Sequence, residues 1–360
     1  LPNTTFMVTG FVKADALWTG TPDGVINGSS AGRDFYIPST IPVNGEDEDV
    51  VFDSHMKQSR FQFGTDTLLD SGDKISSRFE VDFYGSITGN ERISNTYAPV
   101  LRHAYVTYKN WLVGQTWSNV MNVSSLPEAV DFMGTTDGTT FVRQPQLRYT
   151  AGGFSVSVEN PETTVTDFET GARIEADDSS IPDFTARYTL GGDWGNFVIA
   201  GLLRELKYTT TGENKIDDSK WTGFISLSGK WNIFSRDDIR WMLNFGNIGR
   251  YGGLNFSNEA AVNAKGELES IDGVQGFVAW RHVWTDKFRN TLYYAAQDYD
   301  NPGFLSDSVN KSSQSIGLDV FYSPVPKLDV GVGYRYAKRE LEGGDDGTMN
   351  RLQFTTKYSF

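Results

Sequence analysis

The chain has 360 residues, of which 38% are hydrophobic and 14% aromatic, and its formal net charge is −14 at pH 7. An acidic chain without a basic patch is not expected to bind nucleic acid. The absence of cysteine excludes thiol chemistry and thiolate metal sites. Few aliphatic but many aromatic residues favour a wall with a polar inner face and aromatic girdles over a conventional soluble core.

Period-two alternation begins near the N-terminus. Residues 6–15 place Phe6, Val8 and Val12 on one face of a strand and polar side chains on the other. Residues 75–84 show the same pattern, with a charged residue at almost every second position. No run of about 20 apolar residues occurs, so a membrane would have to be crossed by strands and not by a helix.

Amphipathic strands recur along the whole chain. We predict sixteen of them, near residues 5–19, 54–67, 74–85, 99–109, 111–117, 141–151, 153–160, 182–190, 196–208, 220–232, 239–251, 272–285, 288–300, 312–323, 327–340 and 349–360. Tight turns alternate with long polar connections, as periplasmic turns alternate with extracellular loops in outer-membrane barrels. The sequence therefore predicts an all-β fold, a 16-stranded antiparallel transmembrane β-barrel that forms one domain over residues 1–360 and is wide enough to hold water.

The last strand ends on an aromatic residue. Leu352, Phe354, Tyr358 and Phe360 share one face, and polar residues occupy the other. Such a strand at the free end of a soluble protein would expose an adhesive edge. It fits the closing strand of a membrane barrel, and a terminal aromatic residue resembles the signal that barrel-assembly machinery reads.

One long connection has unusual composition. The segment of about 117–140 carries apolar residues, among them Val130 and Phe132, that need a packing partner, and it contains the acids Glu128 and Asp131. Ser125, three residues before Glu128, predicts the start of a helix. We expect this segment to fold into the barrel as a constriction loop; the alternative is a surface loop with one helical turn.

Basic residues occupy many inward positions. The large number of inward basic residues itself indicates a water-filled lumen, because an arginine buried in the core of a soluble protein would need an acidic partner. The candidates for the pore constriction are Lys57, Arg60, Arg78, Arg102, Arg143 and Arg148, with Arg187, Arg240, Arg335 and Arg351 further round the wall. Guanidinium groups bind carboxylates bidentately, so a basic arc facing Glu128 and Asp131 predicts a transverse field and a preference for small anions. The alternative is that these arginines pair with wall acids such as Glu80 and Asp82 and only stiffen the barrel.

Enzyme chemistry is not expected. Glu80 and Asp82 share a face at about 6.6–7 Å, a spacing that overlaps that of inverting glycosidases. Charges are nevertheless expected everywhere on the inner face of a water-filled barrel. His55, His103 and His282 lack metal-ligand spacing, so neither a metal nor a cofactor is predicted.

Acidic residues concentrate in the long connections, for example at residues 46–49, 217–218 and 345–346. Such runs are typical of solvated loops. The alternative is an acidic outer vestibule that holds divalent cations and contacts lipopolysaccharide.

The order of several short motifs resembles one family over essentially the full length. These motifs are residues 6–15, 60–64, 77–85, 101–106, 114–118 and 148–150. In this order they resemble the DcaP-like, dicarboxylate-uptake porins of the Gram-negative outer membrane. The resemblance implies a homotrimer in outer-membrane lipid that takes up small anionic solutes passively, dicarboxylates above all. A general or phosphate-type anion porin is the alternative, followed by an outer-membrane adhesin or enzyme.

Members of this group resemble one another in having a periplasmic coiled coil before the barrel. The given sequence begins at Leu1 and reaches its first strand almost at once. We therefore expect a mature or trimmed chain.

Overall fold

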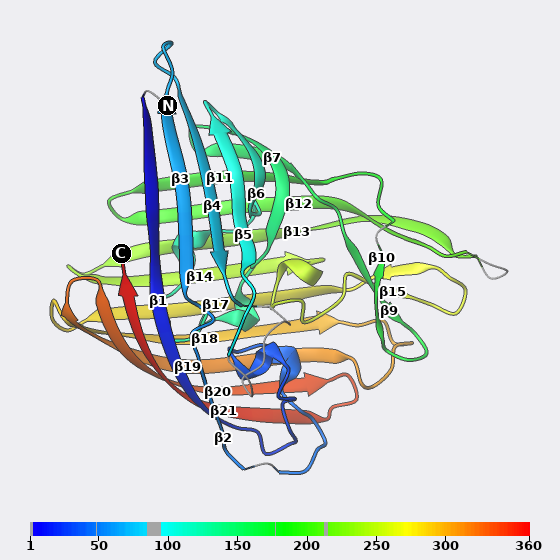
Figure 1. Ribbon diagram of the computed structural model, residues 1–360. Helices are drawn as coiled ribbons and strands as arrows, with labels where there is room; N and C mark the ends of the chain where they lie inside the picture. Colours follow the sequence, from blue (N-terminus) through cyan, green and yellow to red (C-terminus); the bar gives the residue numbers. More distant parts are fainter. Residues whose placement is uncertain (1–2, 48, 85–94, 177, 212–214) are drawn as a thin grey trace.

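The computed structural model describes residues 3–47, 49–84, 95–176, 178–211 and 215–360. Its wall strands form a closed antiparallel β-barrel (Figure 1). They are β1 (Thr4–Gly20), β2 (Val51–His55), β3 (Arg60–Leu68), β4 (Lys74–Asp82), β5 (Val100–Tyr108), β6 (Trp111–Trp117), β7 (Arg143–Ala151), β8 (Phe154–Glu159), β11 (Asp183–Gly192), β12 (Gly195–Thr209), β13 (Asp217–Ile233), β14 (Asp237–Gly246), β17 (Asp272–Val283), β18 (Phe288–Asp300), β19 (Asn310–Val325), β20 (Leu328–Leu341) and β21 (Asp346–Ser359).

Strands β2 and β3 are two halves of one wall strand. Both pair with β1, which aligns Thr4–Phe11 with β3 and Asp15–Thr19 with β2. Between the halves, the backbone N–H of Lys13 donates to Ser59 Oγ at 3.0 Å in place of a ladder bond. With β2 and β3 counted together, the described residues form the sixteen wall strands that the alternation predicted.

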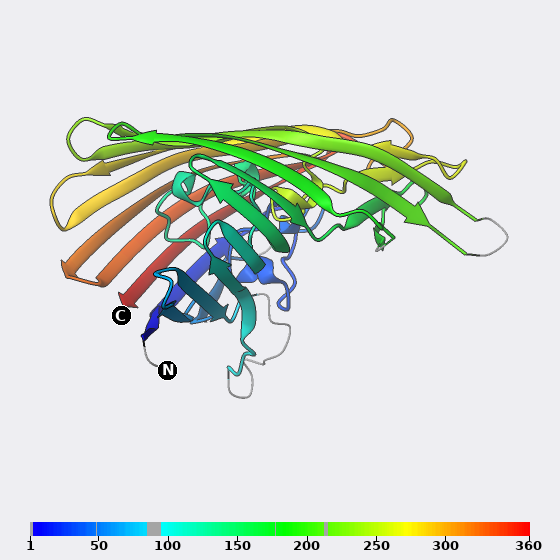
Figure 2. The ribbon, with the colours of Figure 1, turned by 90° about the horizontal axis from the view of Figure 1, so that it is seen from above.

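The barrel closes where the two chain ends meet. Strands β1 and β21 pair from Phe11↔Ser359 to Gly20↔Asn350, and the blue and red strands run side by side in Figure 2. The terminal Phe360 donates its N–H to the Gly10 carbonyl at 3.0 Å. A Cβ at Gly10 would lie 2.1 Å from the Arg60 carbonyl oxygen, so only glycine permits this close approach.

Burial alternates as it does in a membrane barrel. On β4, Phe79 is 46% exposed on the outer face, while its neighbour Glu80 is 8% exposed and faces inward. On β21, Phe354 faces outward and Gln353 inward. The described part of the chain contains no helix long and apolar enough to cross a membrane.

Strand β12 shows a different inner face. Its inward side chains include Val198, Leu202 and Leu206, all buried and apolar. They are dry because long connections fold over them: Leu202 packs with Phe256, and Leu206 packs with Val165. Apolar residues therefore lie on both faces of this strand, with Ile199 and Leu203 on the outer one.

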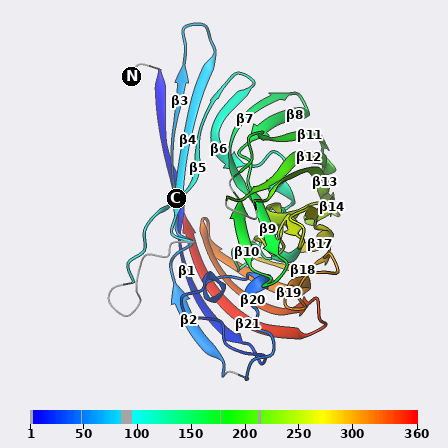
Figure 3. The ribbon, with the colours of Figure 1, turned by 90° about the vertical axis from the view of Figure 1, so that its right-hand side faces the viewer.

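Two long connections form a second, smaller sheet that the sequence did not predict. It consists of β9 (Thr163–Asp167), β10 (Arg173–Ala176), β15 (Ala260–Val262) and β16 (Leu268–Ser270), in the order β10-β9-β15-β16. Strands β9 and β15 pair in parallel, although the connections that carry them are far apart in the sequence. Figures 1 and 3 place this sheet at the end of the barrel where the long connections lie.

Short 3-10 turns are the helical elements of the described residues. They are η1 (Ala31–Arg33), η2 (Pro38–Thr40), η3 (Val123–Ser125), η4 (Thr136–Gly138) and η5 (Gly249–Tyr251). The helix start predicted at Ser125 is wrong, because Ser125 is the last residue of η3 and Asn122 caps that turn. Pro127 follows directly and disfavours a helical conformation at Leu126.

Candidate permeation pathway

The connection between β6 and β7, residues 118–142, lies against the inner face of the wall. Its backbone and side chains are held by inward residues of strands distributed around the barrel. The wall residues that bond to it include Lys13, Glu159, Thr185, Arg187, Ser228, Arg240, Arg289, Ser313, Ser315, Asp319, Arg335 and Gln353. The segment therefore lies inside the barrel over much of its length.

Val130 is fixed at the middle of this segment. Its N–H donates to Asp319 Oδ2 at 3.1 Å, and its carbonyl accepts from Lys13 Nζ at 2.7 Å. The Val130 side chain is 1% exposed. Because a wall carboxylate holds the N–H of this residue and a wall ammonium holds its carbonyl, the segment cannot swing without breaking charge-assisted hydrogen bonds.

The two acids predicted to face the basic arc are held by arginines. Glu128 accepts from Arg289 on β18 with both carboxylate oxygens, from Nε at 2.8 Å and from Nη2 at 2.5 Å. Asp131 accepts from Arg335 on β20 at 3.2 Å. These acids are therefore neutralised locally. Arg289 was missing from the predicted set, because only the path of the loop brings it to Glu128.

The first long connection also enters the lumen, which the sequence did not indicate. Tyr36 is fully buried, and its hydroxyl donates to Asp137 Oδ1 at 2.8 Å. The Arg335 guanidinium lies 4.2 Å from the centre of the Tyr36 ring. Phe35 packs on Phe132 with ring centroids 5.1 Å apart. Phe35 and Tyr36 of this connection thus brace segment 118–142.

Arg60 and Arg102 are paired with wall acids. Arg102 is 2% exposed and bonds both Glu80 and Asp82 at 2.7 Å. Arg60 lies 3.4 Å from Glu80 and 3.5 Å from Asp82. For these two arginines the geometry matches the alternative of wall stiffening. The same contacts occupy the pair of acids whose spacing resembled a glycosidase.

Lys57 and Arg78 have acidic partners as well. Lys57 Nζ lies 2.6 Å from Asp34 Oδ2 and 4.4 Å from the centre of the Tyr97 ring. Arg78 lies 3.0 Å from Asp66.

Arg143, Arg148 and Arg187 differ from the other inward arginines. In the part of the chain that the structure describes, none of them has a carboxylate oxygen within 4.0 Å. Arg143 lies over the rings of Trp117 and Phe141, at 5.1 and 5.8 Å. Its Nη1 is buried without a hydrogen-bond partner among the described residues.

Arg148 and Arg187 are held by neutral groups. Arg148 donates to Gln146 Oε1 at 2.8 Å and to the Trp117 carbonyl at 2.5 Å, and Arg187 donates to the Met121 carbonyl at 2.8 Å. Both are half-buried on the inner face, and their charges repel each other. Among the described residues, Arg148 and Arg187 therefore form no ion pair, and Glu159 of β8 acts on Arg148 only from beyond 4.0 Å.

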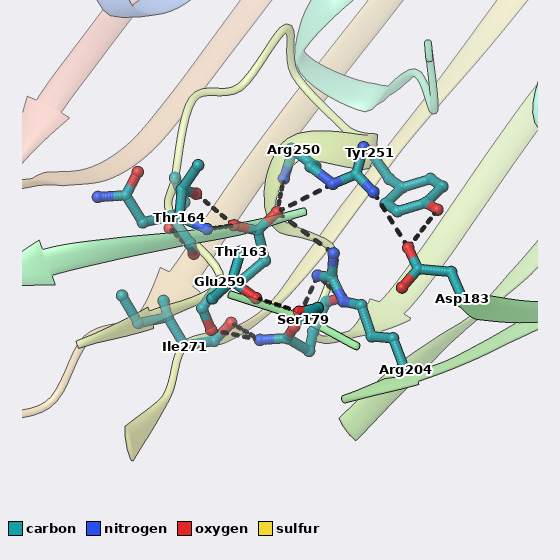
Figure 4. A network of polar contacts seen from close by, with 12 residues as sticks. Thr163, Thr164, Ser179, Asp183, Arg204, Arg250, Tyr251, Glu259 and Ile271 are labelled. Atoms are coloured by element: carbon teal, nitrogen blue, oxygen red, sulfur yellow. Dashed lines mark hydrogen bonds and ion pairs between the residues drawn. The ribbon is translucent and has the colours of Figure 1, made fainter. Parts of the chain in front are cut away.

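A buried ionic network joins the smaller sheet to the wall (Figure 4). Glu259 accepts from the Thr164 and Arg250 backbone N–H groups, both at 2.7 Å, and from Arg204 of β12 at 3.3 Å. Arg250 also bonds Asp183 at 3.1 Å. Burial alone would raise the pKa of Glu259, but Arg204 and Arg250 outweigh it and hold the pKa below its ordinary value of 4.5.

The three histidines lie in polar or aromatic surroundings. His55 contacts the Asp34 carbonyl, His103 bonds Thr116, and His282 bonds Asp237. Within residues 3–47, 49–84, 95–176, 178–211 and 215–360, no three His or acidic side chains are placed to hold a metal ion.

A closed barrel with an apolar outside, a polar inside and a loop folded against its inner wall defines an outer-membrane porin. The family model described as DcaP outer membrane protein matches residues 53–360. The chain belongs to this family, and it is an outer-membrane channel and not an enzyme.

Solved structures agree with the assignment. The outer membrane channel DcaP of Acinetobacter baumannii is 26% identical, with a TM-score of 0.82 over 99% of this chain and 98% of that one. An anion-selective porin from Comamonas acidovorans is 12% identical, with a TM-score of 0.58 over 99% and 100%. Vibrio cholerae OmpT in its trimer form is 14% identical, with a TM-score of 0.58 over 99% of both chains. The last two share the fold. A search of curated proteins finds no match.

Proposed function

We propose that this porin prefers small anions, dicarboxylates in particular, and that segment 118–142 forms its constriction. The proposal rests on Arg143, Arg148 and Arg187, whose guanidinium groups have no carboxylate oxygen within 4.0 Å among the described residues. Two of the three acids of segment 118–142 oppose this group weakly, because Arg289 and Arg335 neutralise Glu128 and Asp131. The third, Asp137, accepts hydrogen bonds from Tyr36, Ser313 and Ser315. A field of one sign in a narrow, low-dielectric lumen raises the local concentration of solutes of opposite sign.

The pair Arg148 and Arg187 supports a solute with two carboxylates. Each guanidinium presents a planar fork that binds a carboxylate bidentately, and the two lie on the same inner face. The bulk charge of −14 does not oppose this, because it is concentrated in long connections and not at the narrow part.

The proposal predicts the effect of a double substitution. Arg148→Gln with Arg187→Gln should slow the uptake of labelled succinate into proteoliposomes by roughly fivefold or more, because two charges that concentrate the anion are lost. Uptake of a neutral sugar of similar size should change little. The matched control is Arg236→Gln, since Arg236 lies in a short turn between β13 and β14 and pairs there with Asp286 at 2.6 Å.

Equal slowing of succinate and sugar would show a merely steric effect and contradict the proposal. If phosphate entered as fast as succinate and responded equally to the substitution, the channel would be an anion porin without dicarboxylate preference.

We also propose a homotrimer, in which some of the outward apolar strands contact neighbouring copies and the rest contact lipid or lipopolysaccharide. The trimeric form of Vibrio cholerae OmpT supports this assembly. A detergent-corrected mass equal to one chain would contradict it.

A further inference from the structure

A second cationic site lies at the extracellular mouth of the barrel and does not include Arg143, Arg148 or Arg187. A cavity of about 190 Å³ opens between the smaller sheet and the ends of β18, β19 and β20. Among the described residues, its lining contains no carboxylate but two arginines, Arg173 and Arg339, together with Asn258, Asn310, Phe256 and Val309. In a chain whose long connections are strongly acidic, a lining of this composition requires an explanation.

Both arginines are held in place by neutral groups. Arg173 on β10 donates through Nε to Asn258 Oδ1 at 2.5 Å and through Nη2 to the Asn255 carbonyl at 2.6 Å. Arg339 on β20 donates through Nε to Asn310 Oδ1 and through Nη1 to the Ile41 carbonyl, both at 2.8 Å. Within the described chain, Arg173 Nη1 and Arg339 Nη2 donate no hydrogen bond.

The asparagines that orient these arginines are themselves fixed. Asn258 Nδ2 donates to Thr166 Oγ1, and Asn310 Nδ2 donates to the Phe256 carbonyl, both at 2.7 Å. Each amide thus turns its oxygen toward a guanidinium. The arginines approach one cavity from different elements, already positioned and without an anionic partner. Such preorganisation lowers the entropic cost of binding a ligand.

Shape and lining restrict the ligand. The cavity is smaller than the sites of drug-sized molecules, which span about 300–1,000 Å³. The apolar residues Phe256 and Val309 also line the cavity. The chemistry that fits is a small dianion with carboxylates joined by a short apolar chain, with one guanidinium for each carboxylate.

We propose that this cavity is an outer binding site for small dicarboxylates, which are captured at the mouth before they reach the constriction. This proposal rests on the proposed function, because it assigns a first binding site to the same dicarboxylates. It explains how an anion passes acidic extracellular loops: a local cationic cavity offsets their repulsion.

The test is a calorimetric titration of the full chain in detergent with succinate. Arg173→Gln with Arg339→Gln should weaken binding at this site about tenfold or more, because charge-assisted hydrogen bonds of this kind are lost. The control, Lys215→Gln with Lys265→Gln, removes the same charge from other extracellular positions and should leave binding unchanged. Retained heat-modifiable mobility and single-channel conductance would show that each variant is folded.

A parallel experiment separates this proposal from the proposed function. Reversal potentials of the Arg173/Arg339 variant should stay anion-selective, because the inner arginines remain. Unchanged succinate affinity in this variant would overturn the outer site and leave the anion-selective channel intact. Tighter binding of inorganic phosphate than of succinate at this site would also overturn the dicarboxylate assignment. The conservative Arg173→Lys with Arg339→Lys should bind succinate with intermediate affinity, because an ammonium lacks the bidentate fork.

Discussion

Arg102 and Arg148 both point into the barrel, but their surroundings give them different tasks. Arg102 is buried between Glu80 and Asp82 and closes a network that joins β4 to β5. Arg148 has only neutral partners and is half-buried on the inner face. An inward arginine that pairs with carboxylates stabilises the wall. One that has neutral partners contributes a positive electrostatic potential to the lumen.

This difference predicts that the same substitution affects stability at one position and anion selectivity at the other. Arg102→Met should lower the free energy of unfolding by about 3 kcal/mol, because it leaves buried carboxylates without their main partner. Arg148→Met should change stability much less but reduce anion selectivity. Urea titrations of both variants in detergent, with reversal potentials for each, would measure this contrast. Equal destabilisation by the two substitutions would contradict the division of roles.

At the scale of elements, Glu259 couples the smaller sheet to the wall through Arg204 and Arg250. Because the folded pKa of Glu259 is depressed, its stabilisation is fully present above the ordinary value of 4.5 and is lost as the pH falls through the folded value. We therefore expect strands β9, β15 and β16 to lose protection in acid before the wall strands do.

Hydrogen exchange measured by mass spectrometry tests this expectation. Peptides covering residues 163–167 and 260–270 should lose protection between pH 6 and pH 3, relative to a peptide from residues 328–341 in the same sample. Glu259→Gln should show weak protection of the smaller sheet already at pH 6. Protection of that sheet that is equal at both pH values would show that Glu259 does not hold it.

The wall strands could be predicted because lipid outside and water inside impose strict alternation on each of them. The smaller sheet could not. Its strands have three to five residues, and every residue of Thr163–Thr166 on β9 is buried, so no period-two pattern exists. Likewise, strand parity indicated which arginines face inward, but the partners of Glu128 and Asp131 depend on the path of a loop whose contacts are far away in the sequence.

At the scale of the whole molecule, a chain of net charge −14 encloses a lumen in which Arg148 and Arg187 form no ion pair with any described residue. The acids lie mainly in the connections or in ion pairs with the wall. Selectivity is set where the passage is narrow and the dielectric constant is low, so the sign of the total charge need not match the sign of the preferred ion. The proposed preference for anions therefore depends on the electrostatic potential inside the lumen.

The most direct measurement is the zero-current potential of the unmodified protein in a planar bilayer across a tenfold gradient of KCl. We expect a potential whose sign shows that chloride permeates more easily than potassium. The potential should be smaller at high salt concentration, because salt screens the fixed charges of the lumen. A potential of the opposite sign would show that acidic side chains determine the selectivity of the channel, and it would contradict the proposed anion preference.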